Sequence, residues 1–460
     1  MFFQQIIADG LGCFSYMIGC PRSGTMAVVD PRRDVQVYLD TAREHGMRIT
    51  HVIDTHIHAD HVTGAHELRA TTGADLCMYS SSPVTFKFHA LQEGDTLEFG
   101  VARIQVLHSP GHTPDALSLL VTDTSRSQDP WMLLTGDVLF VGDIGRPDLA
   151  GSEALEEQVA NLWHTLYEKF AAYPAHLEVY PAHGMGSLCG RGMSSKPSST
   201  LGFERASNPM LGYPDFQSFR TEMTRAFPAR PKSFTHIIET NRTGVPLLEC
   251  CPSEKALSVD SFEKLIDSGA VVIDTRDASA YGGYHIPGSI NIGFEKQLAN
   301  WVGMVVEPTA DLLLVTENRN NYEDMVVELR RIGYDRVFGY LNGGVGTWLY
   351  SGRPLERLDQ LSVHQLKEQL HAAEPPHLLD VRTPSERDAG FIAGSIHLTL
   401  AEVLAGKFDL PPQETTVLYC GGGYRSNIAA SALKAQGYAQ AISLAGGYLA
   451  WTRAGLPVQS

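Results

Sequence analysis

The sequence predicts a multidomain α/β protein, and three observations lead to this prediction. The chain has 460 residues, a typical length for about three domains. A dense group of histidine and aspartate side chains at residues 55–61 lies between a short β-branched segment and a helical one. Residues 272–276 recur at 378–382, which indicates an internal repeat in the C-terminal half. We therefore expect a domain at 1–250 and two smaller ones at 251–355 and 356–460.

Composition and charge narrow the class of function. The hydrophobic content of 43% is ordinary for a globular protein, and the net charge of −16 argues against a nucleic-acid partner. No segment is long and apolar enough to span a membrane, and the N-terminus lacks the features of a signal peptide. Seven cysteines without disulfide-framework or zinc-ribbon spacing fit a reducing compartment. We expect a cytoplasmic protein that acts on small molecules, with no membrane partner.

The sequence pattern of the N-terminal part predicts strands and helices that end in polar residues. Apolar, β-branched segments predict strands at 2–7, 13–18, 26–29, 48–54, 116–121, 131–134 and 177–180, with a hairpin over 96–107. Helical spacing predicts helices at 35–45 and 152–170. Cys13 and Cys20 lie in or beside such strands, and we expect both to pack in the core.

Seven candidate metal ligands each follow an apolar strand. They are His56, His58, Asp60, His61, His112, Asp137 and His183. Histidine and carboxylate suit zinc, iron and manganese. If all seven coordinate, two metals can share Asp137 and activate a hydroxide for hydrolysis. If two histidines and one carboxylate coordinate, one Fe(II) keeps positions open for substrate and O2. The spacing leaves both arrangements open.

This ligand pattern resembles the metallo-β-lactamase superfamily over roughly residues 1–240, which implies an αββα sandwich. Segments 55–64, 109–113, 135–137 and 145–148 look more closely like persulfide dioxygenases. That resemblance implies one Fe(II) per chain, held by His56, His112 and Asp137. It leaves His58, Asp60, His61 and His183 to orient these ligands or to form a second metal site, and it places Arg146 and Asp148 where that family has substrate-side and structural polar groups. Cys189 follows His183 closely in the sequence, so both an approach to the metal pocket and burial as a small packing residue stay open. Segments 180–190 and 197–204 look like the multidomain dioxygenase–sulfurtransferase fusions.

A glycine-rich loop follows the predicted strand 416–419. It reads Cys420, Gly421, Gly422, Gly423, Tyr424, Arg425, Ser426 and leads into a helix. The glycines let successive N–H groups point inward, and the helix N-terminus and Arg425 add positive potential that favours a thiolate or persulfide. Because glycine-rich loops do not bury thiols in a core, we do not expect Cys420 to be a buried structural cysteine. The loop resembles rhodanese, which implies that Cys420 is the nucleophile and that 421–424 and Ser426 cradle its persulfide.

The repeat at 251–355 lacks this loop. Its strand 312–315 leads into Thr316, Glu317 and Asn318, with neither cysteine nor glycine. We expect a rhodanese-like domain without sulfurtransferase activity.

Together these features predict a persulfide dioxygenase joined to a sulfurtransferase, acting in sulfide detoxification. The expected partners are a thiol persulfide such as that of glutathione or coenzyme A, O2, and sulfite or thiosulfate. The alternative is a glyoxalase II-type dinuclear zinc thioester hydrolase fused to a sulfurtransferase. Fusions of this kind often self-associate, so the sequence is compatible with a homo-oligomer as well as with a monomer.

Overall fold

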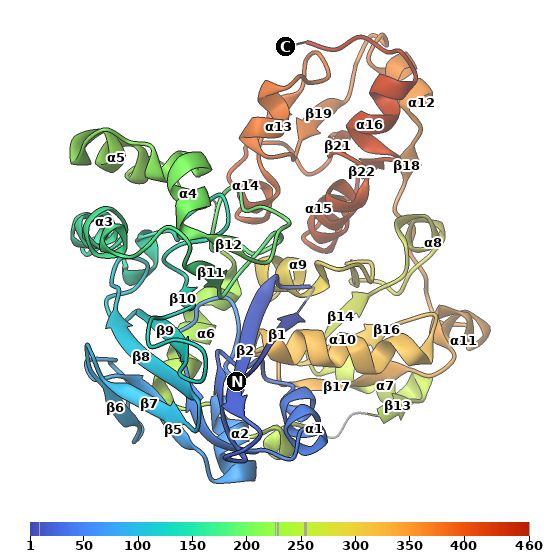
Figure 1. Cartoon of the computed structure of the whole chain (residues 1–460). Helices are drawn as coiled ribbons and strands as arrows, with labels where there is room; N and C mark the ends of the chain where they lie inside the picture. Colours follow the sequence, from blue (N-terminus) through green and yellow to red (C-terminus); the bar gives the residue numbers. More distant parts are fainter. Residues whose placement is uncertain (9, 226, 228–229, 253–254, 460) are drawn as a thin grey trace. The chain divides into compact units, whose positions relative to one another are not determined.

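The computed structural model describes residues 1–460 except 9, 226, 228–229, 253–254 and 460 (Figure 1). Contacts divide the chain into two compact units. The first comprises Met1–Cys250 with Arg330–Gly333, and the second comprises Cys251–Leu329 with Tyr334–Ser460. Within the described ranges, no helix has the length and apolar character that a membrane crossing requires.

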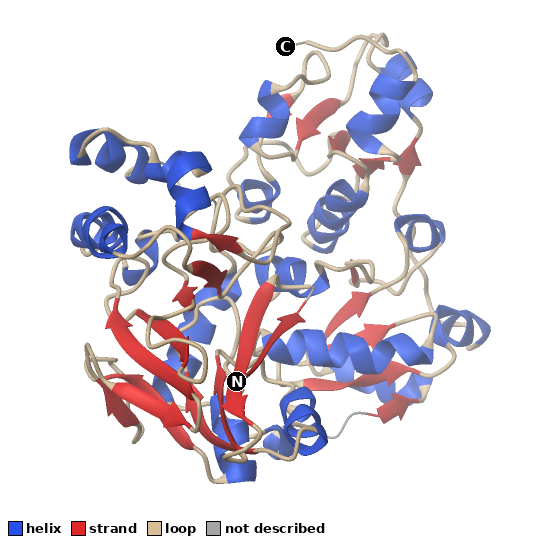
Figure 2. Cartoon of the chain, viewed as in Figure 1, coloured by secondary structure: helices blue, strands red, loops and turns tan. Residues whose placement is uncertain are grey.

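The first unit contains two six-stranded sheets. The first sheet runs in the order β1 (Phe2–Ala8), β2 (Cys13–Cys20), β3 (Thr25–Val29), β4 (Arg48–Ile53), β5 (Asp75–Tyr79), β6 (His89–Leu91). The second runs β12 (Ser199–Thr200), β11 (Glu178–Pro181), β10 (Met132–Gly136), β9 (Leu117–Asp123), β8 (Ala102–His108), β7 (Thr96–Phe99). Figure 2 shows these strands in red.

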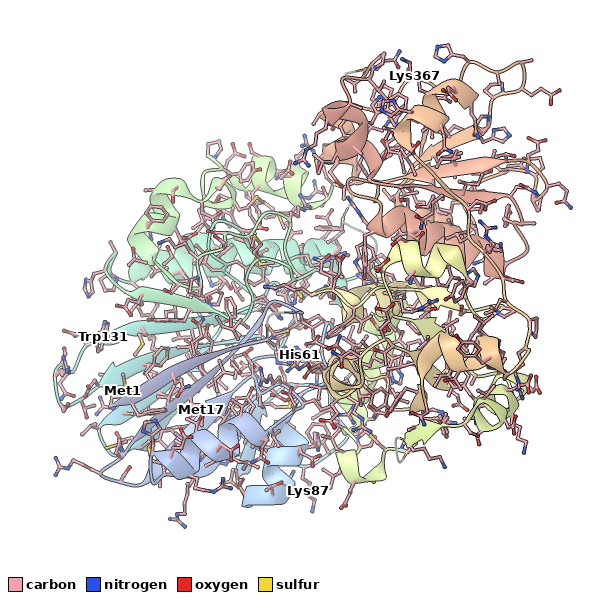
Figure 3. All side chains as sticks on the ribbon, turned by 90° about the vertical axis from the view of Figure 1, so that its right-hand side faces the viewer. Met1, Met17, His61, Lys87, Trp131 and Lys367 are labelled. Atoms are coloured by element: carbon pink, nitrogen blue, oxygen red, sulfur yellow. The ribbon has the colours of Figure 1, made fainter. Side chains whose placement is uncertain are left out.

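The two sheets pack face to face, with helices on their outer faces. Tyr16 and Ile18 of β2 share one buried cluster with Ile104 and Val106 of β8, so this core lies between the sheets. Figure 3 shows Met17 among the packed side chains of this unit and Lys87 at its periphery. This layering confirms the predicted αββα sandwich.

The helices of this unit cover the sheets in two groups. One outer cluster joins the first sheet to α1 (Gln36–Glu44) and α2 (Ala65–Thr72), and another joins the second sheet to α3 (Leu155–Trp163) and α5 (Phe216–Met223). The remaining helices are α4 (Leu201–Ser207) and α6 (Lys232–Thr243). The single helix predicted over 152–170 is in fact α3 followed by a π-helical turn, His164–Lys169.

The second unit contains two five-stranded sheets in which every strand pair is parallel. One runs β13 (Lys255–Leu257), β17 (Val337–Leu341), β16 (Leu312–Val315), β14 (Val271–Asp274), β15 (Ile290–Asn291). The other runs β18 (Gln360–Leu361), β22 (Ala441–Leu444), β21 (Thr416–Tyr419), β19 (His377–Asp380), β20 (Ile396–His397). The two strand orders are equivalent, as the internal repeat predicts.

Helices alternate with these strands. The first sheet is accompanied by α7 (Val259–Asp267), α8 (Ala278–Gly283), α9 (Leu298–Val305), α10 (Arg319–Arg331) and α11 (Gly344–Tyr350). The second is accompanied by α12 (Val363–Gln369), α13 (Pro384–Asp388), α14 (Leu400–Leu404), α15 (Tyr424–Ala435) and α16 (Gly447–Arg453). This alternation confirms the predicted parallel α/β architecture.

Candidate metal centre and sulfur-transfer loop

Three predicted ligands meet at one point of the first unit. His56 follows β4, His112 follows β8 and Asp137 follows β10 directly. Asp137 Oδ2 lies 3.4 Å from His112 Nε2 and 3.8 Å from His56 Nε2, and the three side chains are buried. Their ligand atoms all lie within 4.8 Å of one another. The loops at these strand ends therefore bring two imidazoles and one carboxylate together.

The three converging atoms have no hydrogen-bond partner among the described residues. Burial, and then the charge of His58, hold the pKa of His56 well below its ordinary value, and burial also lowers the pKa of His112. Burial alone would raise the pKa of Asp137, but His183 and then His56 bring it well below its ordinary range. Neutral imidazoles beside an ionised carboxylate, with their lone pairs unused, fit a divalent metal.

Hydrogen bonds fix the orientation of both imidazoles. His112 Nδ1 donates to the Arg146 carbonyl (2.8 Å), and His56 Nδ1 donates to Thr55 Oγ1 (3.0 Å). Asp30 then accepts hydrogen bonds from Thr55 N (2.7 Å) and Thr55 Oγ1 (2.9 Å). Each ring is thereby held in the tautomer that leaves Nε2 free for a metal.

Asp30 is a contributor that the sequence analysis missed. It follows β3 with a φ of 48°, an uncommon conformation for a residue other than glycine. Besides Thr55, its carboxylate contacts His58 Nε2 (3.1 Å). An aspartate placed directly after the Val28–Val29 strand end was the available signal.

The structure places His58 beside the three converging ligands, in a separate group with Asp30 and Asp54. Its ring lies 4.2 Å from that of His56, and its Nδ1 is buried without a described hydrogen-bond partner. Asn241 of α6, which the sequence analysis also missed, donates to the backbone carbonyls of His58 and His61, at 2.9 Å each. The C-terminal part of this unit thus braces the histidine-rich loop.

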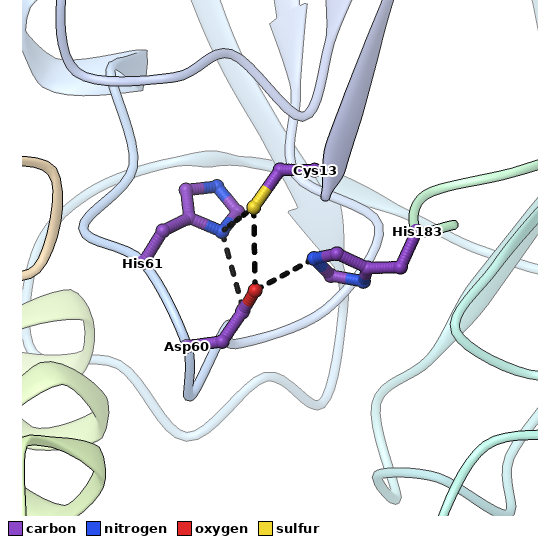
Figure 4. A group of neighbouring side chains, drawn as sticks. All are labelled: Cys13, Asp60, His61 and His183. Carbon is purple, nitrogen blue, oxygen red and sulfur yellow. Dashed lines mark hydrogen bonds and ion pairs between the residues drawn. The ribbon is translucent and has the colours of Figure 1, made fainter. Parts of the chain in front are cut away.

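The other predicted ligands form a neighbouring cluster. His183 Nδ1 lies 2.5 Å from Asp137 Oδ1, and its Nε2 lies 2.7 Å from Asp60 Oδ2. His61 Nδ1 is 3.2 Å from Asp60 Oδ1. Cys13 joins this group, because its thiol donates to Asp60 Oδ2 at 3.3 Å (Figure 4). Cys13 is buried as expected, but it faces these polar groups instead of simply packing in the core.

The three residues predicted near the substrate have different surroundings. The buried Arg146 guanidinium binds Asp148 (2.6 Å), so this pair supports the loop whose carbonyl orients His112. Cys189 is buried and groups with Asp137 and His183. Burial, and then the charges of Asp60 and Asp137, hold its pKa well above the ordinary value, which favours the protonated thiol.

The predicted sulfur-transfer loop follows β21 and leads into α15. Cys420 is only 1% exposed, so the thiol is buried, contrary to expectation. Its Sγ accepts a hydrogen bond from Gly423 N (3.1 Å), and Gly423 has a φ of 104°, which favours glycine. Ser426 Oγ donates to the Gly423 carbonyl (3.1 Å). These contacts hold the sulfur inside the curled loop.

Two further features surround this loop. Arg425 is paired with Glu386 (2.6 Å), a residue that the sequence analysis missed. Gly422, Gly423 and Tyr424 line a cavity of about 650 Å³ within the second unit. A small sulfur compound therefore has space beside the cysteine loop.

Comparisons with known proteins agree with this architecture. The metallo-beta-lactamase superfamily profile matches residues 8–183, and the rhodanese-like domain profile matches residues 258–350 and 362–454. The chain belongs to the metallo-beta-lactamase superfamily and carries two rhodanese-like domains. This homology identifies the chain as an enzyme and implies a bound metal.

Three relatives illustrate these similarities. Persulfide dioxygenase ETHE1 from Bos taurus is 30% identical over 204 residues, which cover 43% of this chain and 71% of that protein. Hydroxyacylglutathione hydrolase from a Polaromonas strain is 32% identical over 173 residues, covering 37% of this chain and 61% of that protein. A solved metallo-beta-lactamase from Staphylococcus aureus is 30% identical, with a TM-score of 0.67, and covers 74% of this chain and 99% of that one.

Proposed function

We propose that this enzyme oxidises a low-molecular-weight thiol persulfide with O2 at one Fe(II) and transfers sulfane sulfur through Cys420. The convergence of His56 Nε2, His112 Nε2 and Asp137 Oδ2 carries this proposal. Two histidines and one carboxylate are the typical ligand set of non-haem Fe(II) oxygenases. The similarity to persulfide dioxygenases supports the same assignment.

His56, His112 and Asp137 would hold Fe(II), which would supply open positions for a substrate sulfur and for O2. The protein's own contribution is to orient and shield the ligands. The Arg146 carbonyl and the Thr55–Asp30 pair fix the two imidazoles, and burial of all three ligands limits access of water. Overall, one persulfide, one O2 and one water give the carrier thiol, sulfite and two protons: the S–S bond breaks, the terminal sulfur loses four electrons to O2, and the third oxygen of sulfite comes from water.

The second half of the proposal concerns Cys420. Its thiolate attacks the sulfane sulfur of a persulfide, the S–S bond to the carrier breaks, and the carrier leaves as a thiolate. The Gly423 N–H that now contacts Sγ holds the resulting cysteine persulfide. Sulfite then takes the outer sulfur to give thiosulfate and regenerates Cys420. Production of sulfite and its consumption on one chain suit the detoxification of sulfide.

We propose three functional divisions: a dioxygenase domain at 1–250, a rhodanese-like domain without activity at 251–355, and a sulfurtransferase domain at 356–460. The loop after β16 supports the lack of activity at 251–355. In this loop Thr316 Oγ1 donates a hydrogen bond to the Asn318 carbonyl and accepts one from Asn318 N, so the hydroxyl is used within its own turn. That loop offers neither a nucleophile nor a glycine cradle.

A second candidate is a dinuclear zinc hydrolase that cleaves a thioester of a thiol carrier. The similarity to hydroxyacylglutathione hydrolase and the unpartnered Nδ1 of His58 favour it. In that arrangement His58, Asp60, His61 and His183 would all be ligands, and Asp137 would be shared.

The deciding experiment measures oxygen uptake and metal content on the same anaerobically purified, iron-loaded protein, with glutathione persulfide and coenzyme A persulfide as substrates. We expect about one iron per chain and rapid uptake. His112→Ala should lose both the iron and the uptake. His176→Ala is the matched control, because His176 is an exposed histidine outside the site and its loss should change neither.

The competing result is equally definite. About two zinc ions per chain, no oxygen uptake with either persulfide, and hydrolysis of an acylated glutathione would replace the dioxygenase assignment with the hydrolase.

A further inference from the structure

The cavity beside the cysteine loop has a second wall, which the middle rhodanese-like domain (residues 258–350) supplies. On one side the cavity is lined by Gly422, Gly423 and Tyr424. On the other side it is lined by Asp277 after β14, Glu295 after β15 and Glu317 after β16. We call these three carboxylates the acidic wall. All of them lie at the carboxyl ends of parallel strands, where α/β domains commonly bind ligands.

Buried polar contacts hold the middle domain against α15, the helix that follows the cysteine loop. Tyr424 Oη donates to the Gly293 carbonyl at 2.8 Å. Asn427 Nδ2 donates to Asn291 Oδ1 at 2.5 Å. Asn291 N donates to Ser431 Oγ at 3.1 Å, and Asn291, Asn427 and Ser431 are all buried. Because these contacts are shielded from water, they keep the strand ends of the middle domain in place beside the cysteine loop.

The described residues leave the cavity with a net negative charge. Arg276 is the only cationic side chain among the described residues that line it. Its guanidinium is buried and bound through two nitrogens to Asp274, at 2.9 and 2.7 Å, so its charge is already balanced. Glu295 and Glu317 are exposed, and their carboxylates form no ion pair within the described part of the chain. Both carboxylates are therefore available to a ligand.

The charge of the acidic wall acts on the cysteine loop itself. Burial, and then the charge of Glu295, raise the pKa of Tyr424, which follows Gly423 in that loop. A cleft lined by charges of one sign raises the local concentration of ligands of the opposite sign and repels ligands of the same sign. A molecule that reaches Cys420 through this cavity is therefore favoured if it carries a positive charge.

We propose that the acidic wall selects the sulfur donor of Cys420, and that this donor is a low-molecular-weight persulfide with an ammonium group, which Glu295 and Glu317 bind. The inference rests on the proposed transfer of sulfur through Cys420 and specifies the class of thiol carrier. The Cys420 thiolate bonds to the outer sulfur of the persulfide, the S–S bond to the carrier breaks, and the carrier leaves as a thiolate that takes a proton from the solvent. The ammonium group is unchanged, and no oxidant is required.

This assignment gives the middle domain a part in sulfur transfer, although residues 258–350 contain no cysteine. Glu295 and Glu317 are specificity-determining residues, because they bind the carrier and not the sulfur that moves. Anionic donors such as thiosulfate gain no contact with these carboxylates and are repelled by them.

Two small persulfides of equal length test this selection. Cysteamine persulfide carries an ammonium group, and 3-mercaptopropionate persulfide carries a carboxylate in the same place. Each is mixed with the full-length protein, the reaction is quenched by alkylation, and sulfur gained by the peptide that contains Cys420 is followed by mass spectrometry. We expect cysteamine persulfide to load Cys420 at least about tenfold faster, and we expect this preference to shrink as salt is added.

Variants of the acidic wall separate charge from structure. Glu317→Gln and Glu295→Gln each remove one charge and keep the size of the side chain. Each should slow loading by cysteamine persulfide about threefold and speed loading by 3-mercaptopropionate persulfide about threefold. A loss of folding would slow both. Glu368→Gln is the matched control, because Glu368 is an exposed residue of α12 outside the cavity, and its loss should leave the preference unchanged.

The outcomes distinguish this inference from the proposed function. If both persulfides load Cys420 with a ratio that neither Glu317→Gln nor Glu295→Gln changes, the charge selection is wrong and sulfur transfer stands. Faster loading by 3-mercaptopropionate persulfide in the wild type would have the same meaning. If neither persulfide nor thiosulfate loads Cys420, the transfer itself is wrong and the selection falls with it.

Discussion

The two rhodanese-like domains have the same framework but different loops at the same place. Each has a buried arginine paired with the aspartate that ends its strand: Arg276 with Asp274 (2.7 Å) and Arg382 with Asp380 (2.6 Å). In each, a tryptophan Nε1 donates to a proline carbonyl six residues later, from Trp348 at 2.9 Å and from Trp451 at 2.8 Å. The framework has therefore been retained where the cysteine is absent.

The loops after β16 and β21 show what has changed. In the C-terminal domain Gly423 places its N–H on the Cys420 sulfur, and Tyr448 N and Leu449 N donate to the Cys420 and Gly421 carbonyls. In the middle domain the equivalent loop carries Glu317. The two domains thus share framework residues, and they differ in the loop residues to which we assign the holding of sulfur.

The largest expected effect concerns Cys420, the proposed nucleophile of the C-terminal domain. Cys420→Ser should reduce sulfur transfer from thiosulfate to cyanide by at least about 10³-fold, because no other loop of the described residues places a cysteine in a glycine-rich turn before a helix. Formation of thiocyanate by the full-length protein is the measurement, and Cys250→Ser is the control. Residual transfer near the wild-type rate would mean that the middle domain or another cysteine carries the activity.

A matched pair of glycine variants tests the space around the two loops. An added Cβ at Gly447 would lie 2.3 Å from the Cys420 carbonyl oxygen, whereas at Gly344 the nearest atom, the Thr316 carbonyl oxygen, is 3.4 Å away. Both positions have positive φ, so each alanine should cost about 1–2 kcal/mol of stability. Gly447→Ala should in addition shift the cysteine loop and lower sulfur transfer by about 10²-fold.

Thermal unfolding of both variants measures the loss of stability, and the thiocyanate assay measures the loss of sulfur transfer. Equal activities for Gly447→Ala and Gly344→Ala would contradict the view that close contact with Gly447 shapes the cysteine loop.

The smallest expected effect concerns pH. Burial alone would raise the pKa of Glu386, but Arg425 and the Thr383 backbone N–H lower it from 4.5 to about 2. A carboxyl whose pKa is lower in the folded state stabilises the fold above its unfolded value, and this stability is lost as pH falls toward the folded value. The melting temperature of the wild type should therefore exceed that of Glu386→Gln at pH 6, and the gap should narrow between about pH 4.5 and 2.

Melting curves of both proteins from pH 6 to pH 3 provide the measurement. The effect should be modest because the Glu386 side chain is 36% exposed and water screens the pair. A gap that stays constant with pH would show that the pair with Arg425 adds no pH-dependent stability.

Local sequence determined much of the fold and indicated several candidate ligands. Alternating strands and helices predicted the parallel sheets, and the repeat predicted two equivalent domains. His56, His112 and Asp137 were predictable as candidate ligands because each lies at or shortly after the end of an apolar strand, and strand ends gather at sheet edges. The helix over 152–170 was predicted only in outline, since helical spacing cannot show where α3 continues as a π-helical turn.

Other contributions were decided only by the tertiary structure. Cys13 and Asp60 are 47 residues apart, and Asn241 lies 183 residues from His58, whose backbone it holds. Glu386 lies 39 residues from Arg425 and offered no motif that would pair them. These contacts form because separate strands and helices pack around shared cores, so the side chains that meet depend on packing and not on spacing along the chain. The sequence by itself thus determined the fold class and the proposed nucleophile, while packing decided which groups orient the candidate ligands and which additional thiol lies beside them.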